Sequence, residues 1–415
     1  MSSAHDATGV LTVNGERLLA DLRQLATIGA TAEGGVNRPA YGDEDLAAHE
    51  VVRQWIGAAG LAVRVDTAGN TFGRLPSTND APPIVIGSHT DSVPDGGRFD
   101  GALGTLAALE VARSVAQYGM TLRHPLEIVN FQNEEGGLIG SKAVAGRLSA
   151  NDLAIKAVSG FTICEGIRRL GGEPDRLAEA VRAPGSIAAY VELHIEQGRV
   201  LERAEADIGV VEGIVGISYW DVTFNGVAAH AGTTPMADRH DALLAAARFI
   251  DAVNGTVVTL PGRHVGTVGR LSVFPGAPNV IPGRVTLTLE LRDLDQQHID
   301  ALFAVVAREA ERIAADTGTT VALRPTTAVT PAPTDARVRE AIALAARLHG
   351  LQSLDMPSGA GHDAQNMAAI APSGMFFVPS VDGISHSPRE FTSDADVVKG
   401  ANVLLGTVLR LDATM

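Results

Sequence analysis

Cysteine is nearly absent from this 415-residue chain, which contains only Cys164. A single thiol cannot form an intrachain disulfide, and it cannot build a thiolate metal cluster. Any metal site must therefore take its ligands from histidine, aspartate and glutamate.

Long hydrophobic runs and an excess of positive charge are also missing. No stretch approaches the ~18 apolar residues of a membrane span, and the start MSSAHDATGVLTVNGERLL lacks the basic and apolar regions of a signal peptide. The net charge of −15 argues against a nucleic-acid or anionic-membrane partner. We therefore expect a soluble cytoplasmic protein whose partner is a small molecule.

The overall composition is that of a globular protein with a sizeable core. Hydrophobic residues make up 45% of the chain and charged residues 20%. A chain of this length exceeds what one hydrophobic core usually serves, so we expect two domains. Up to about residue 213, strand and helix patterns alternate, which is typical of βαβ units and a mostly parallel sheet.

The pattern changes from residue 214 onward. Strand, helix, two strands, helix and strand follow one another, and this βαββαβ order is that of a ferredoxin-like domain. The chain then returns to the earlier alternation. We therefore predict an α/β protein in which an inserted ferredoxin-like α+β domain, residues 214–329, interrupts a catalytic domain formed by residues 1–213 and 330–415.

Four predicted strands, IVIGSH, LEIVNF, YVELHI and MFFVPS, run into ionisable residues at or beyond their carboxyl ends, where open α/β sheets bind ligands. In YVELHIEQG the period of two turns His194 away from the apolar face. The candidates are His89, Asp100, Glu134, Glu135, His194 and His386. Taken singly, each histidine also fits a structural role, and the glutamate pair fits a solvated turn. Together they predict a divalent metal site.

A series of segments then resembles one known family. In chain order they are GSHTDSVPDGGRFDGALG, NEEGG with GSKAVAG, ELHIEQGRVLE, GVAAHAGTTPM, PGAPNVIPGRV, GAGHDAQNMA and FFVPSVDGISHSPREFT. They resemble the amidase, hydantoinase and carbamoylase branch of the M20 metallopeptidase family over nearly the whole chain. The resemblance implies a catalytic domain with two metal ions and an inserted domain that serves as lid and dimerisation domain.

The same resemblance assigns the metal ligands. Asp100 would bridge two divalent ions, which could be Zn, Mn, Co or Ni. The remaining ligands would be His89, His194, Glu135 and His386. Asp91 would hold the imidazole of His89, as metal-bound histidines generally require.

Two further residues would carry the chemistry. Glu134 would move the protons as general base and then acid. His230 would stabilise the ionised substrate oxygen, supplied across the interface of a homodimer. A loop histidine beside Gly232 is the alternative for His230.

The resemblance also names residues that would contact the substrate: Gln197, His230, Asn279, Arg292, Gly359 and Gly361. Arg292 lies opposite the apolar face of RVTLTLELRD, where its guanidinium can hold a carboxylate through two hydrogen bonds. A solvated strand-end arginine is the alternative, and Gln197 and Asn279 also fit turns. One departure from the family is the short loop EEGGLIGS, which many relatives have longer and with Arg-Phe after the acidic pair.

The resemblance implies an amidohydrolase that cleaves a linear C–N bond. An N-carbamoyl-L-amino acid is the expected substrate, and allantoate or a β-ureido acid is the alternative. A peptidase or aminoacylase fits these motifs less well. A catalytically silent binding protein would be expected to lack part of the ligand set, and every position is filled.

Overall fold

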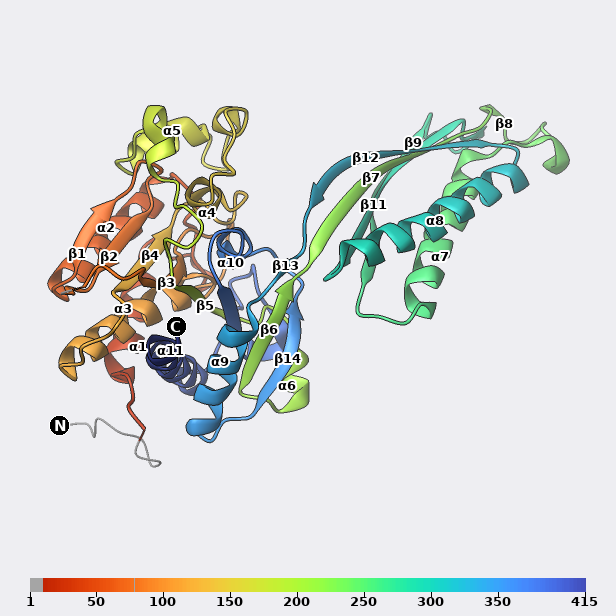
Figure 1. Ribbon diagram of the computed structural model, residues 1–415. Helices are drawn as coiled ribbons and strands as arrows, with labels where there is room; N and C mark the ends of the chain where they lie inside the picture. Colours follow the sequence, from red (N-terminus) through yellow and green to blue (C-terminus); the bar gives the residue numbers. More distant parts are fainter. Residues whose placement is uncertain (1–9, 78) are drawn as a thin grey trace. The chain divides into compact units, whose positions relative to one another are not determined.

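The structure is a computed structural model that describes residues 10–77 and 79–415 (Figure 1). Residues 1–9, which belong to the start examined for a targeting signal, lie outside the described residues. The chain divides into two compact units: unit 1 holds the described residues up to Gly213 and Pro333–Met415, and unit 2 holds Ile214–Ala332. The sequence placed the second boundary at residue 329. The boundary lies later because the chain rejoins the sheet of unit 1 only at β13 (Ala332–Pro333).

Unit 1 is built on one mixed sheet. Its strands are β1 (Ala62–Val65), β2 (Thr71–Arg74), β3 (Ile84–His89), β4 (Leu126–Phe131), β5 (Ala189–Ile195), β6 (Ile208–Ile214), β13, β14 (Ser353–Ser358) and β15 (Ser373–Val378). The order is β1-β2-β4-β3-β5-β15-β6-β13, with β14 beside β6. The four central strands β4, β3, β5 and β15 run parallel, whereas β2 and β6 join them antiparallel. The expected mostly parallel central sheet is therefore confirmed.

The central strands are buried along their whole length, which explains why they read as continuous apolar runs rather than as alternating patterns. The longer helices of unit 1 are α1 (Gly15–Leu25), α2 (Asp43–Ala58), α3 (Ala102–Gln117), α9 (Ala336–Leu348) and α11 (Asp394–Thr414). Helix α3 packs against β3, β5, α1 and α11, so it is apolar nearly all round.

Short helices occupy the connections of unit 1. They are α4 (Ile139–Val144), η1 (Asp152–Ala154), α5 (Ile163–Arg169), η2 (Pro174–Glu179), α6 (Val200–Ala204), α10 (Asp363–Met367) and η4 (Val381–Gly383). Of these, α4 and α10 pack against each other, and α10 also contacts β5 and β15.

Unit 2 has the element order βαββαβ. Its main strands are β7 (Gly216–Asn225), β9 (Val265–Phe274), β11 (Arg284–Asp293) and β12 (Thr320–Val329), in the antiparallel order β12-β7-β11-β9. Helices α7 (Ala242–Thr259) and α8 (Gln296–Asp316) lie on one face of this sheet (Figure 1). The turn η3 (Met236–Asp238) and the short strands β8 (Ala229–His230) and β10 (Val280–Ile281) complete the unit. Strand β11 buries alternate residues, as its sequence predicted.

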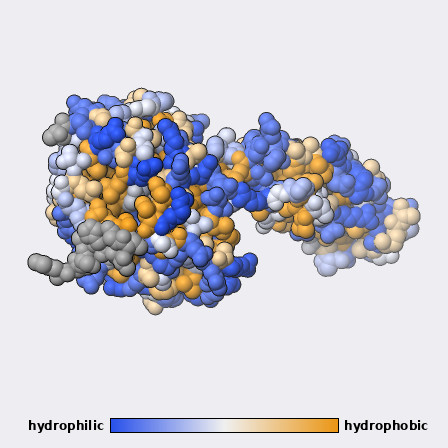
Figure 2. Space-filling view, turned by 60° about the horizontal axis from the view of Figure 1, so that its bottom comes forward, coloured by the Kyte–Doolittle hydropathy of each residue, from blue (hydrophilic) through white to orange (hydrophobic). Residues whose placement is uncertain are grey.

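Helix α7 bears on the expectation that no segment approaches a membrane span. Among the described residues it is the one helix long and apolar enough to cross a membrane by length and composition, and 28% of it is buried. Its buried residues include Ala245, Phe249 and Val253, which pack in the core of unit 2. Part of its apolar content therefore serves that core and the rest is exposed. Figure 2 shows hydrophobic residues interspersed with hydrophilic ones on the displayed face of each unit.

Candidate metal centre

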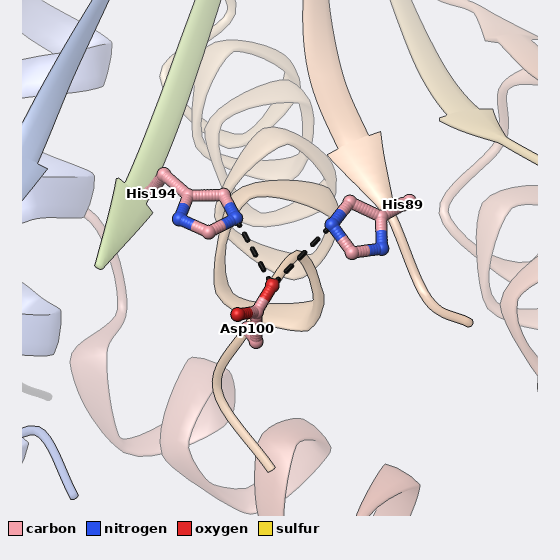
Figure 3. Close-up of side chains that lie close together, drawn as sticks. All are labelled: His89, Asp100 and His194. Carbon is pink, nitrogen blue, oxygen red and sulfur yellow. Dashed lines mark ion pairs between the residues drawn. The ribbon is translucent and has the colours of Figure 1, made fainter. Parts of the chain in front are cut away.

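Three buried ligand atoms meet at the carboxyl edge of the central sheet. His89 is the last residue of β3, and His194 lies near the end of β5, the parallel neighbour of β3. Asp100 comes from the loop before α3 and points between the two rings (Figure 3). Its Oδ1 lies 3.2 Å from Nε2 of His194 and 3.5 Å from Nε2 of His89. All three residues are buried.

The hydrogen-bond partners of the two histidines indicate which ring nitrogen faces Asp100 without a proton. Nδ1 of His89 lies 3.0 Å from the main-chain oxygen of Asp91, and Nδ1 of His194 lies 2.9 Å from that of Ile195. A carbonyl oxygen can only accept, so in the neutral ring each Nδ1 carries the hydrogen and each Nε2 keeps its lone pair. Nε2 of His89 is buried without a hydrogen-bond partner. Three electron-pair donors thus converge, an arrangement that a divalent cation stabilises.

A glycine makes this convergence possible. Gly101 has a φ of 61°, and a Cβ added to it would lie 2.4 Å from the ring of His89. Any other residue would therefore push the Asp100 turn away from the histidine. This position explains the last glycine of the GRFDG segment.

A second set of ligand atoms lies on the other oxygen of Asp100. Nε2 of His386 is 3.5 Å from Oδ2 of Asp100 and 3.5 Å from Oε1 of Glu135. The Glu135 side chain is 12% exposed and the His386 side chain 49%. The second set is therefore more open to solvent than the first, and the two sets share Asp100.

Asp91 holds the glutamate turn and also lies beside the ring of His89. Its Oδ1 and Oδ2 accept hydrogen bonds from the main-chain N–H groups of Glu134 and Glu135, at 3.1 and 3.2 Å. Its carboxylate lies 3.5 Å from Nδ1 of His89, farther than its own carbonyl oxygen. The imidazole is thus oriented by the main chain of Asp91, and the carboxylate connects the loop after β3 to the turn after β4.

The two glutamates are buried beside each other and beside further negative charge. Burial raises the pKa of Glu134 well above its usual range, and the nearby charges of Glu135 and Asp363 add to this. Burial and the charge of Asp100 raise the pKa of Glu135 to about 8. Oε2 of Glu134 lies 3.7 Å from Nε2 of His89. A carboxyl group with a raised pKa at this position is suited to holding a proton and passing it on.

Gln197 reaches into the second ligand set. Its Nε2 donates a hydrogen bond to Oδ2 of Asp100 at 2.7 Å and lies 3.4 Å from Nε2 of His386. Its backbone has a φ of 59°, an uncommon left-handed conformation for a residue with a side chain. The side chain of Gln197 is therefore held at the proposed ligand atoms. It does not have the free side chain of an ordinary turn residue.

The sequence reasoning did not assign His362, although it lies inside the quoted segment GAGHDAQNMA. Its ring is buried, with its centroid 4.5 Å from that of His194, and its ring nitrogens have no hydrogen-bond partner. Burial and the charge of His194 lower the pKa of His362 well below its usual range. Gly359 and Gly361 belong to the same segment, which therefore runs beside the ligand set.

Three candidate substrate residues, His230, Asn279 and Arg292, belong to unit 2. His230 pairs with Val280 across β8 and β10, next to Asn279. Its Nδ1 accepts hydrogen bonds from the main-chain N–H groups of Gly232 and Thr233, at 3.0 and 3.2 Å. Because Nδ1 is an acceptor, Nε2 of the exposed ring carries the hydrogen and can donate it.

Arg292 lies in the four-stranded sheet of unit 2, at the end away from the β8–β10 pair that holds His230. In the β7–β11 ladder, Arg284 pairs with Asn225 at the end near β8, and Arg292 pairs with Ile217 at the end where β7 begins. Eight residues of strand separate the two ends, about 26 Å at the usual rise. The Nε of Arg292 donates to Oε1 of Glu290 at 2.6 Å. One copy of unit 2 therefore cannot offer His230 and Arg292 to the same small substrate.

Comparison with known proteins gives matches over most of the chain. Peptidase family M20/M25/M40 matches residues 85–410. An N-carbamoyl-L-amino acid amidohydrolase of Geobacillus stearothermophilus is 42% identical over 405 residues, covering 96% of this chain and 99% of that protein. An allantoate amidohydrolase of Bacillus subtilis is 34% identical, covering 93% and 95%. The crystal structure of an amidase of the hydantoinase/carbamoylase family from Burkholderia multivorans aligns with a TM-score of 0.89 at 41% identity, covering 96% and 98%.

Proposed function

Because this chain belongs to peptidase family M20/M25/M40 and is a metal-dependent amidohydrolase, we propose that it converts an N-carbamoyl-L-amino acid to the L-amino acid, CO2 and ammonia. The observation that carries the reaction class is the sharing of Asp100 by two sets of ligand atoms. The full-length match to a carbamoyl amino acid amidohydrolase supports the choice of substrate.

The proposal includes two divalent ions per subunit. His89 and His194 would hold one ion, Glu135 and His386 would hold the other, and Asp100 would bridge them. Nitrogen and oxygen donors of this kind suit Zn, Mn, Co or Ni. Ions bound there supply Lewis acidity toward water and toward the substrate carbonyl oxygen.

Within this scheme Glu134 moves the protons. It is next to Glu135 yet lies in neither ligand set, so its carboxylate is available to water and to the leaving nitrogen. As base it takes a proton from the attacking water, and as acid it returns that proton to the nitrogen that leaves. The raised pKa of Glu134 favours its accepting a proton.

Residues of unit 2 would bind the substrate. The Nε2–H of His230 would donate a hydrogen bond to the oxygen that becomes negatively charged. Arg292 would hold the substrate carboxylate, and Asn279 lies beside His230. From unit 1, Gln197 and the segment with Gly359 and Gly361 would contact the remaining polar atoms.

We also propose that the protein is a homodimer in which unit 2 acts as lid and dimerisation domain. Exposed apolar side chains support this: Leu243, Leu244, Ile250 and Val258 of α7, and Phe274 of β9. Helix α7 packs against β9, and β9 is an edge strand that can pair with a second copy. In such a dimer, His230 would serve the neighbouring subunit. A cytoplasmic location completes the proposal, in keeping with a chain that has one cysteine.

Allantoate is the second candidate substrate, because an allantoate amidohydrolase is among the matched relatives. The short turn after Glu135 bears on this choice. Cδ1 of Leu138 lies 3.7 Å from the position of a Cβ on Gly361, so this turn borders the segment proposed to contact substrate. Its length is therefore expected to affect which side chain the substrate can carry.

An ammonia-release screen tests the proposal. The purified protein is depleted with chelator, reloaded with Zn, Mn, Co or Ni, and offered N-carbamoyl-L- and D-amino acids, 3-ureidopropionate and allantoate. N-acetylamino acids, whose cleavage releases no ammonia, are followed through the amino acid that is released. We expect the highest kcat/KM with an N-carbamoyl-L-amino acid and little release from its D-isomer. Faster turnover of allantoate would favour the second candidate. Absence of turnover in every metal-loaded sample would leave only a binding role.

A further inference from the structure

Glu390 is a buried carboxylate that the proposed chemistry does not use. It is 3% exposed and lies four residues after His386. Its Oε1 accepts hydrogen bonds from the main-chain N–H groups of Phe99 and Asp100, at 2.9 and 3.1 Å. Its Oε2 accepts one from the hydroxyl of Ser385 at 3.0 Å. The Glu390 side chain therefore contacts the main chain of Asp100 and the side chain of Ser385, which precedes His386.

These contacts connect two loops that are far apart in the sequence. Asp100 precedes α3, and the loop with Ser385 and His386 lies between β15 and α11. The Ser385 hydroxyl is also 3.1 Å from Oδ2 of Asp100. Glu390 therefore binds the main chain of Asp100, and the Ser385 hydroxyl lies between the carboxylates of Asp100 and Glu390. Together these contacts connect the two loops.

Gly97 leaves the space that Glu390 fills. A Cβ on Gly97 would lie 1.9 Å from Cδ and Oε1 of Glu390, so the carboxylate could not stay where it is. Gly97 is not among the glycines with positive φ, and its backbone can therefore accept alanine without strain of its own. A methyl group at this position would displace Glu390 while every proposed metal ligand keeps its identity.

We propose that Glu390 is a positioning residue that sets the separation of Asp100 and His386, and with it the affinity for the second ion. This inference rests on the two-ion site proposed above. His89 and His194 are placed by the adjacent parallel strands β3 and β5, and they face Oδ1 of Asp100. His386, Ser385 and Gln197 face Oδ2. Loss of Glu390 should therefore weaken the second ion much more than the first.

The test measures Co²⁺ binding to the chelator-treated full-length protein by equilibrium dialysis and visible absorption. The variants are Gly97→Ala, Glu390→Leu and Glu390→Gln. Glutamine keeps the size and an acceptor oxygen for the two N–H groups, and its amide nitrogen can donate to Ser385, so it is the conservative control. Leucine removes both acceptors at similar length. Circular dichroism and thermal unfolding show whether each variant is folded.

Wild-type protein should bind two Co²⁺ ions per subunit. In Gly97→Ala and Glu390→Leu we expect one ion to bind about 10- to 100-fold more weakly, while the other stays within about twofold and its absorption band is unchanged. Glu390→Gln should bind both ions like wild type. Equal weakening of both ions in folded variants, or normal binding by Gly97→Ala, would overturn the inference. If the wild-type protein itself bound only one Co²⁺ ion per subunit, that result would contradict the two-ion proposal on which this inference rests.

Discussion

The side-chain amide of Gln197 donates a hydrogen bond of 2.7 Å to Oδ2 of Asp100. The same nitrogen lies 3.4 Å from Nε2 of His386. The partly positive N–H groups of this amide therefore face a carboxylate oxygen and an imidazole nitrogen that we propose as ligands of the second ion. A cation bound there would compete with the amide for Oδ2, and the Gln197 side chain would then have to turn toward other partners.

This competition predicts that Gln197→Asn raises the affinity for the second ion. Asparagine accepts the positive φ of this position, and its shorter side chain withdraws the amide. Loss of a typical hydrogen bond, about 0.5–1.5 kcal/mol, should tighten Co²⁺ binding roughly two- to tenfold. Equilibrium dialysis measures this. Gln54→Asn, on the exposed side of α2, is the matched control, and weaker binding in Gln197→Asn would instead make Gln197 a ligand.

A second prediction concerns Asp100, which both ligand sets share. Chelation should abolish activity, and Asp100→Ala should lose both ions because each set then lacks its common oxygen donor. Metal analysis and circular dichroism of the purified variant measure the loss and the retained fold. Asp95→Asn, in the same loop, is the control and should keep two ions. An active protein that holds no metal would contradict the proposed chemistry as a whole.

The third prediction separates the two adjacent glutamates. Glu134→Gln should retain both ions and lose about two to four orders of magnitude in kcat, because its carboxylate moves protons and lies in neither ligand set. Glu135→Gln should instead lose the ion that Asp100 and His386 share. Metal content and steady-state kinetics are measured on both variants. If Glu134→Gln lost metal and kept its kcat at full occupancy, the two roles would be exchanged.

The sequence predicted that the candidate ligands lie together at one edge of the sheet for a simple physical reason. Parallel strands end at the same edge, so ligands that follow β3, β4, β5 and β15 had to lie near one another. The alternation in β11 likewise showed which face Arg292 takes. The contacts of Gln197 and Glu390 were not predictable, because they join residues about a hundred or more positions apart and depend on loop geometry. His362 belongs to the segment GAGHDAQNMA, but the sequence does not show that its ring lies beside that of His194.

The register of unit 2 was also hidden from the sequence. His230 and Arg292 were both predicted to contact the substrate. About 26 Å of β11 separates Arg292 from Arg284, at the end of the four-stranded sheet near the β8–β10 pair that holds His230. The resemblance implied that the partner subunit supplies His230, but it did not say which copy of the chain supplies Arg292. The two predictions that remain follow from this separation.

The fourth prediction is that His230 acts on the neighbouring subunit. His230→Ala and Glu134→Gln should each be nearly inactive alone. In a mixture that exchanges subunits, each heterodimer has one site with both residues intact, so about a quarter of wild-type activity should return. Activity is measured before and after exchange, and each variant mixed with itself is the control. Heterodimers that stay inactive would place His230 in its own subunit or outside the site.

The last prediction concerns Arg292 and its own subunit. Replacing a charged hydrogen bond to carboxylate typically costs about 1.5–3 kcal/mol, so Arg292→Ala should raise KM roughly ten- to hundredfold for carboxylate substrates and change little for their neutral amides. Arg324→Ala, which removes an exposed arginine paired with Asp221 on a neighbouring strand, should leave KM unchanged.

Because one copy of unit 2 cannot present His230 and Arg292 to the same substrate, Arg292 should serve its own subunit if His230 serves the partner. An exchanged mixture of Arg292→Ala and His230→Ala should then regain activity, since one site per heterodimer takes Arg292 from one chain and His230 from the other. The mixture of Arg292→Ala with Glu134→Gln should stay impaired. In that heterodimer one site lacks Arg292 and the other lacks Glu134, so no site is intact. The reverse pattern in the two mixtures would place Arg292 across the interface with His230.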